Sequence, residues 1–191
     1  MIGGAHLFNG KKAGLTEDRF ARPLSALSLN GGSYQIPPGN YFQNGQFSIT
    51  TWIKLKNYGS YPGLVKFSNG FKNESIFLGF NMGTSKPQFI IFNGNQIERI
   101  ANSISSSAIQ LNIWTHLAMT FDQNFNNLIY VNANITASGN LNQPLKYTTR
   151  ISNYIGRPDG NQPDLNGTID ELKIFNRALS QQEIQFEMNN I

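Results

Sequence analysis

The sequence contains no cysteine, which excludes a disulfide framework, a thiolate zinc site and a cysteine nucleophile. It also has no run of about 18 apolar residues, so no segment is predicted to insert into a membrane. Charged residues make up only 14% of the 191 residues. The polar surface must therefore be built largely from asparagine, serine, threonine, glutamine and glycine.

The excess of positive over negative charge is also small. Fifteen basic residues against 11 acidic residues give a net charge of +4, and Lys11–Lys12 is the only adjacent basic pair. A protein that binds nucleic acid usually clusters its basic residues on one face. The scattered charges predict no nucleic-acid partner.

The dominant pattern is the alternation of apolar and polar residues that is typical of β-strands. In Phe47–Leu55, the odd-numbered apolar residues share one face, and Trp114–Phe121 places Leu117, Met119 and Phe121 together. Further short runs of this kind are Ala26–Leu29, Ser75–Phe80, Gln88–Phe92, Asn127–Val131, Asn153–Ile155 and Thr168–Phe175. Turn clusters rich in Gly, Asn and Pro separate them. Many short strands at such spacing predict an all-β protein, an antiparallel two-sheet β-sandwich or jelly roll.

One short C-terminal helix is predicted. Ser180-Gln-Gln-Glu183 has the pattern of a capping box, and Ile184 and Met188 follow four residues apart on one face. No internal repeat or linker interrupts the chain, so residues 1–191 are expected to form a single domain. Residues 1–25 carry the weakest pattern.

Three groups of segments together resemble one family. They are Ser25–Ile36 with Phe47–Lys54, Trp114–Asp122 with Ile129–Asn132, and Tyr154–Gly156 with Asn166–Glu171 and Phe175–Ser180. Their order and spacing resemble the laminin-G-like jelly-roll domains of the concanavalin-A-like superfamily. The resemblance implies two antiparallel sheets packed face to face and a non-catalytic module that binds a glycan or protein ligand, often with calcium.

The resemblance also implies a location. The first residues, Met1–Ala5, do not form a signal peptide, because no charged segment is followed by an apolar one. Members of the family are mostly parts of larger surface or secreted proteins. We therefore expect an extracellular or cell-surface module with neighbouring domains in a longer chain. A purely structural spacer domain is the alternative.

The superfamily also contains glycoside hydrolases, which makes a hydrolase-like enzyme the second alternative. Those relatives carry acidic residues at alternate positions of one strand, so that two carboxyl groups face one cleft. Here Glu17-Asp18 and Asp170-Glu171 are adjacent pairs, and neighbouring residues of a strand point to opposite faces. No alternating set occurs, and the sequence predicts that the protein is not an enzyme.

The segment Arg157–Asp164 is the best candidate for a ligand-binding loop. Arg157, Asp159, Asn161 and Asp164 offer charged and amide groups, and Asp159 and Asp164 with nearby carbonyls make calcium a candidate cofactor. The spacing is not that of an EF-hand, and the same residue types form ordinary loops.

Two further positions are candidates. Trp52 falls on the strand face opposite Phe47, Ile49 and Ile53, where a ring can stack on a sugar or be covered by a loop or by the helix. Trp114, the other tryptophan, shares a face with His116, which we expect to be a packed structural residue.

Asp170 lies in phase with Leu172 and Ile174, which predicts a buried carboxylate. A buried carboxylate requires a partner. Arg177 is one candidate, and a calcium ion is the other, so that Asp170 joins Asp159 and Asp164 as a candidate metal ligand.

Overall fold

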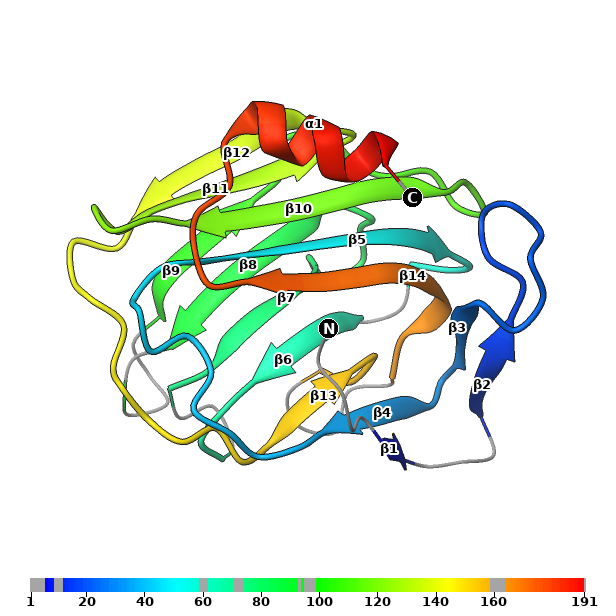
Figure 1. The fold of residues 1–191 in the computed structure, drawn as a ribbon, viewed down its shortest axis with the longest axis horizontal. Helices are drawn as coiled ribbons and strands as arrows, with labels where there is room; N and C mark the ends of the chain where they lie inside the picture. The colour runs from blue at the N-terminus through cyan, green and yellow to red at the C-terminus, as the bar shows by residue number, and fades with distance from the viewer. Residues whose placement is uncertain are drawn as a thin grey trace.

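Two antiparallel sheets packed face to face make up the computed structural model of the protein (Figure 1). The structure describes residues 6–8, 12–58, 62–70, 74–92, 94, 99–158 and 164–190. In this part of the chain, one sheet has the order β1-β4-β13-β6-β7-β8-β9 and is called the opposite sheet here. The other has the order β12-β11-β10-β5-β14-β3-β2 and is called the helix-side sheet. The predicted jelly-roll sandwich is confirmed.

The opposite sheet consists of β1 (His6–Phe8), β4 (Ser33–Ile36), β13 (Asn153–Ile155), β6 (Gly63–Phe67), β7 (Ile76–Phe80), β8 (Pro87–Phe92) and β9 (Arg99–Ile104). The helix-side sheet consists of β12 (Asn134–Asn140), β11 (Asn126–Val131), β10 (Thr115–Phe121), β5 (Phe47–Leu55), β14 (Asn166–Phe175), β3 (Ala26–Asn30) and β2 (Ala13–Thr16). The helix α1 spans Gln181–Asn189. It has nine residues, so no described helix has the length needed to cross a membrane.

The core lies between the two sheets and follows the predicted alternation. Phe47, Ile49, Ile53 and Leu55 of β5 are completely buried. Leu117, Met119 and Phe121 of β10 belong to the same apolar cluster, which confirms the predicted inner faces. The cluster takes further residues from the opposite sheet, for example Phe67, Leu78, Phe80 and Phe89. Burial of these apolar side chains is the main stabilising contribution to such a sandwich.

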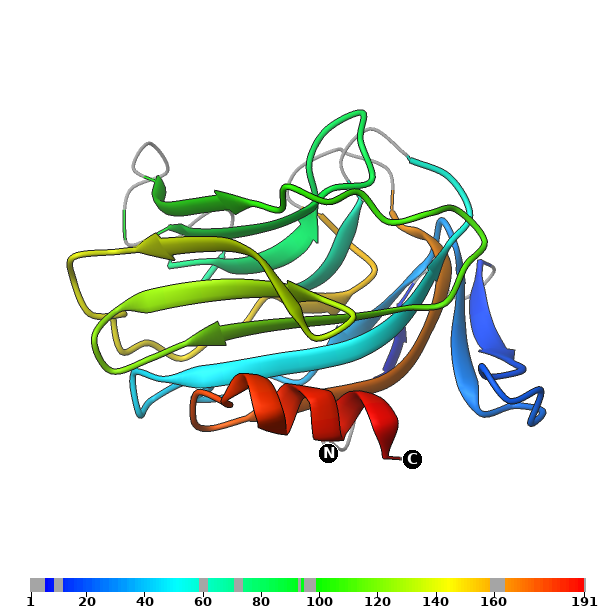
Figure 2. The ribbon, with the colours of Figure 1, turned by 90° about the horizontal axis from the view of Figure 1, so that it is seen from above.

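The helix packs on the outer face of the helix-side sheet (Figure 2). Ile184 is completely buried against Ala118 and Tyr130. The predicted capping box is present: the Ser180 hydroxyl accepts a hydrogen bond from the backbone of Glu183, whose side chain accepts one from the Ser180 backbone. The cap therefore fixes where the helix begins above the sheet.

A bulge in β14 changes the predicted faces of this strand. The register against β5 shifts between Asp170 and Lys173, and Glu171 has a positive φ of 51°. Asp170 pairs with Trp52 of β5 and lies on the outer face, whereas Leu172 and Ile174 pack towards the core. The phase that the sequence suggested for Asp170 was wrong, because the extra residue of a bulge reverses the alternation.

The capping box and the helix face give the first prediction. Ser180→Ala should lower the free energy of unfolding by about 1 kcal/mol, because an N-cap is lost. Ile184→Ala should lower it by about 2–5 kcal/mol, because it opens a cavity under the helix. Gln185→Ala, at an exposed position of the same helix, is the control and should change it by less than about 0.5 kcal/mol. Denaturant unfolding curves measure all three, and equal effects at Ile184 and Gln185 would contradict the packing.

Candidate functional site

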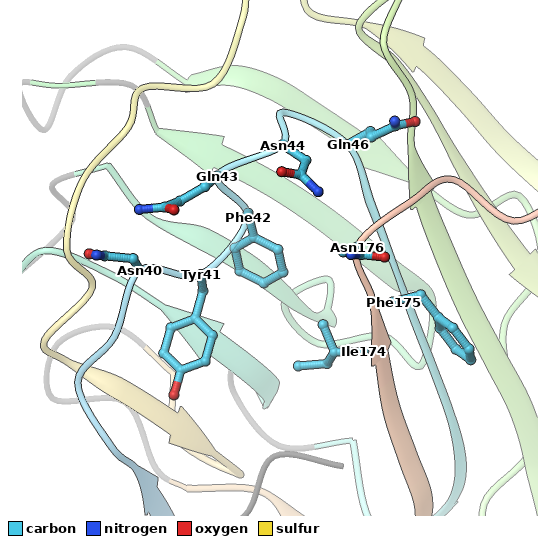
Figure 3. A pocket seen from close by; sticks show the side chains of 9 residues that line it. All are labelled: Asn40, Tyr41, Phe42, Gln43, Asn44, Gln46, Ile174, Phe175 and Asn176. Atoms are coloured by element: carbon cyan, nitrogen blue, oxygen red, sulfur yellow. The ribbon is translucent and has the colours of Figure 1, made fainter.

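A cleft of about 360 Å³ opens at one end of the sandwich, between the segment before β5 and the end of β14 (Figure 3). We call it the amide cleft, because amide side chains form much of its lining. It is lined by Asn40, Tyr41, Phe42, Gln43, Asn44, Gln46, Ile174, Phe175 and Asn176. None of these side chains carries a charge at neutral pH. In Figure 3 the amide groups are spread around Phe42, and Ile174 lies across from Tyr41.

Phe42 fixes the shape of the loop that forms one wall. Its ring packs 4.3 Å from the ring of Phe47 and meets the ring of Phe67 edge-on at 5.0 Å. Its φ of 66° lies in the left-handed region, which a residue with a side chain rarely adopts. The aromatic packing compensates for this strain, which is often found where a loop serves a binding function.

Thr149 and Arg150, which precede β13, hold the same loop from the other side. Arg150 forms an isolated β-bridge with Gly39, and the Thr149 hydroxyl donates to Asn40 Oδ1 at 2.8 Å. The Arg150 guanidinium lies 5.7 Å from the centre of the Phe42 ring. Burial lowers the pKa of Arg150 to about 10, while the nearby Glu74 raises it, so the side chain stays charged at neutral pH. The cleft thus has a rigid wall.

The opposite wall is held by β5. The Ser48 hydroxyl donates to the backbone carbonyl of Arg177 and accepts from the backbone N–H of Leu179, both at 2.8 Å. These bonds fix the chain directly after Asn176. The two walls of the cleft are therefore positioned by adjacent residues, Phe47 and Ser48.

The chemistry of the amide cleft is that of a site for a neutral polar ligand. Each amide offers a carbonyl acceptor and two N–H donors, which match hydroxyl groups in either direction. The aromatic and aliphatic side chains can cover the apolar C–H face of such a ligand. The sequence gives no signal for this cleft, because Gln43, Asn44 and Gln46 are residue types of ordinary turns.

The candidate loop is only partly described. Asp159 and Asn161 lie outside the described residues. Arg157 is half-buried, with its guanidinium 5.2 Å from the centre of the Tyr154 ring. Asp164 is half-buried too, and its pKa is raised by burial, against the lowering effects of Ser33, Arg157 and Lys12. The positive charge of Arg157 therefore acts on the Asp164 carboxyl group.

The other two predicted site residues lie elsewhere, on the outer face of the helix-side sheet. Asp170 pairs with Trp52 across the strands, and Trp52 pairs with His116 of β10. The four residue-to-residue steps from Asn166 to Asp170 in β14 extend over about 13 Å, so Asp164 and Asp170 are too far apart to ligate one ion. Among the described residues, no three acidic or histidine side chains gather as a metal site.

Arg19 covers this outer-face row and is the partner of Asp170. Its Nη1 lies 2.5 Å from Asp170 Oδ2, with both side chains almost completely buried, and its guanidinium lies 5.0 Å from the centre of the Trp52 ring. Arg177, the partner suggested by the sequence, instead pairs with Glu183 at 2.7 Å. Trp52 is thus on the outer face, as predicted, and is covered by a loop. Nothing in the sequence marks Arg19 as this partner, because the segment before β3 has little apolar periodicity.

His116 is a packed residue, as predicted. It is 1% exposed, and its ring meets the Trp52 ring at 5.4 Å in an edge-on arrangement. Burial, followed by the charges of Arg19 and Lys173, lowers the pKa of His116 from 6.5 to about 4. The imidazole is therefore neutral at physiological pH.

The low pKa of His116 predicts a pH dependence of stability. Between pH 6.5 and about 4 the unfolded chain binds a proton at this position and the folded chain does not, so stability falls as the pH falls through this window. The loss should total about 3 kcal/mol. His116→Phe should remove this part of the dependence, as measured by unfolding curves at several pH values. An unchanged pH profile in the variant would show that His116 does not titrate as described.

The fold defines a class, the antiparallel jelly-roll sandwiches. A family model for laminin-G-like domains, described as the concanavalin A-like lectin/glucanases superfamily, matches residues 29–185. Because the match covers most of the sequence, the chain belongs to this superfamily. A comparison with curated proteins finds no match.

Solved structures share the fold. The binding domain of Paraclostridial Mosquitocidal Protein 1 has a TM-score of 0.73 at 17% identity, over 97% of this chain and 47% of that one. Domain 4 of AbnA, a GH43 extracellular arabinanase from Geobacillus stearothermophilus, in complex with arabinotriose, has a TM-score of 0.68 at 18% identity. The match covers 97% of this chain and 99% of that one. The botulinum neurotoxin serotype D binding domain has a TM-score of 0.70 at 14% identity, and the match covers 97% of this chain and 46% of that one. The chain spans about half of each toxin domain and nearly all of the arabinanase domain.

Proposed function

We propose that this protein is a non-catalytic recognition module that binds a neutral glycan in the amide cleft. The cleft carries the proposal, because it combines uncharged hydrogen-bonding side chains with exposed ring and aliphatic surface in a rigid frame. The structural neighbours support a ligand-binding role: one is an arabinanase domain in complex with arabinotriose, and others are toxin binding domains. A protein ligand at the same cleft is the alternative within this class.

The ion pairs of the acidic residues support a non-catalytic role. Asp18, Asp170 and Glu183 are each bonded to an arginine, and Glu171 and Glu187 both contact Lys173. A glycosidase needs two carboxyl groups facing each other across a cleft, at about 5 to 9.5 Å. The residues lining the amide cleft include no carboxylate. A hydrolase-like activity is therefore the weaker proposal.

The setting of the module is also part of the proposal. The toxin domains that share the fold are about twice as long as this chain, and the arabinanase domain belongs to an extracellular enzyme. We propose an extracellular module that acts beside neighbouring domains of a longer chain. A spacer in such a chain would share the fold but would have no saturable ligand.

Glycan binding is tested with an array of neutral oligosaccharides that includes arabinotriose, followed by calorimetry on each ligand found. Gln43→Ala and Asn176→Ala, on opposite walls, should each raise Kd about 5- to 10-fold, because each removes hydrogen bonds worth roughly 1 kcal/mol. Gln110→Ala, at an exposed amide outside the cleft, is the matched control and should leave Kd unchanged.

Two outcomes would contradict this assignment. The absence of saturable binding to any glycan or protein ligand would favour the spacer. Saturable binding that neither cleft variant weakens would place the ligand elsewhere on the module.

We further propose that the loop from Arg157 to Asp164 binds calcium weakly, through Asp159, Asp164 and neighbouring carbonyls. Asp170 is poorly suited as a ligand because Arg19 occupies its carboxylate. Two carboxylates and carbonyl groups make a site of the low affinity that is common in extracellular modules.

Thermal unfolding in chelator and then in excess calcium tests the site. At a hundredfold excess over Kd, binding to the native state adds about 2.7 kcal/mol and raises the midpoint by a few degrees. Asp164→Asn should abolish this calcium-dependent shift, whereas Asp170→Asn should retain it from a lower starting midpoint. An identical midpoint with and without calcium, or a shift lost only in Asp170→Asn, would contradict the proposed loop.

A further inference from the structure

An apolar pocket opens next to the point where β3 and β14 stop pairing. The two strands pair as far as Leu27 and Ile169, and the register of β14 then shifts at its bulge. The space beside this point encloses about 230 Å³ and is called the apolar pocket here. Its lining includes the side chains of Leu15, Leu27, Ile36, Ile155, Ile169 and Leu172.

Leu15 forms the entrance of the apolar pocket. It lies two residues after Ala13 in β2, so the two side chains share the face of the strand that packs towards the core. Leu15 is nevertheless 55% exposed, whereas Ile36 and Ile169 are each 1% exposed. The pocket therefore has a buried apolar floor and an apolar entrance that is open to solvent.

The polar side chains around the pocket are already engaged within the protein. The Ser25 hydroxyl donates to a backbone carbonyl at 3.1 Å. Asp170 is bonded to Arg19, and Glu171 Oε2 lies 3.2 Å from Lys173 Nζ. The pocket thus offers a ligand mainly apolar surface, which favours an apolar group over a hydroxylated one.

The volume of the pocket limits the size of that group. An apolar cavity of about 150 Å³ lined by leucine, isoleucine and phenylalanine is large enough to bind benzene. The pocket has 230 Å³ and a lining of the same kind, so it can hold a phenyl ring or a short alkyl chain. Removal of such a group from water favours binding.

The apolar pocket and the amide cleft are neighbours along one strand. Leu172 lines the pocket and Ile174 lines the cleft, and both side chains pack towards the core from β14. Two residues of a strand extend over about 7 Å. One small ligand with a polar part and an apolar part can therefore reach both sites.

We propose that the apolar pocket takes the aglycone of a neutral glycoside, that is, the apolar group attached to a sugar that lies in the amide cleft. This inference rests on glycan recognition as the proposed function and names the ligand class, glycosides that carry an aryl or short alkyl group. An apolar side chain of a protein ligand is the alternative occupant, and the experiment separates the two.

Paired glycosides that differ only in the aglycone test this inference by calorimetry. The probes are the methyl and phenyl glycosides of D-glucose, D-galactose and L-arabinose. For at least one sugar, the phenyl glycoside should bind at least about 10-fold more tightly than the methyl glycoside, because its ring is removed from water. Toluene, which has no sugar, should saturably shift the methyl signals of Leu172 and Ile155 in proton–carbon correlation spectra.

Two variants and a matched control locate the aglycone. Leu27→Phe should reduce the phenyl-over-methyl affinity ratio to about 1, because the larger side chain fills the pocket. Leu15→Ser should reduce the ratio about 3-fold, because the entrance loses apolar surface. Leu24→Ser, at a leucine that is 68% exposed and outside the pocket, should leave the ratio unchanged. Leu15→Ser decides the matter if unfolding curves show that Leu27→Phe is not folded.

The outcomes distinguish failure of this inference from failure of the proposed function. Methyl glycosides that bind through Gln43, with phenyl glycosides that bind no more tightly, would overturn the inference and leave glycan recognition standing. A phenyl advantage that survives both pocket variants would also overturn it, because the ring would then lie elsewhere. A response to toluene without binding of any glycoside would contradict both, and would favour an apolar side chain of a protein ligand as the occupant.

Discussion

The alternation of side chains along β5 is the constraint on which the rest of the structure depends. One face of this strand, from Phe47 to Leu55, enters the core, and the other carries Ser48, Thr50, Trp52 and Lys54. Because β5 lies between β10 and β14, its register sets the faces of both neighbours. A slip of one residue would exchange the core face and the polar face at once.

The amide cleft follows directly from this strand. Phe47 points inward and packs on Phe42, which shapes one wall. Ser48 points outward and holds the backbone of Arg177 and Leu179, which fixes the other wall. Two consecutive residues on opposite faces of β5 therefore position the two walls of the cleft. A preformed site loses little conformational entropy when a ligand binds.

Much of the fold could be predicted because its strands alternate strongly. β5 and β10 have clear apolar faces, and the capping box at Ser180 marks the helix. β12 was not identified, because an edge strand with the sequence Asn-Ile-Thr-Ala-Ser-Gly-Asn buries too little apolar surface to show a period. The bulge at Glu171 could not be foreseen either. The bulge is visible in the register against β5 and in the positive φ of Glu171, and no residue type marks it in the sequence.

The candidate sites were harder to predict than the fold. The charge of Arg157 acts on the Asp164 carboxyl group, but Trp52 and Asp170 belong to a structural row with Arg19, which is 151 residues distant from Asp170 in the sequence. Charged residues are the usual candidates for ligand binding, yet here many of those described form ion pairs. The amide cleft is instead lined largely by asparagine and glutamine, whose role depends on which loops the fold brings together.

The segment after β12 frames the amide cleft from the side of β13. After Asn140 the chain runs along the end of the sandwich to Thr149, which bonds to Asn40 at the cleft (Figure 1). Arg150 anchors the end of this segment by its β-bridge to Gly39. The wall that Phe42 shapes by packing on Phe47 is therefore also held from outside, by a segment that follows the edge strand of the helix-side sheet.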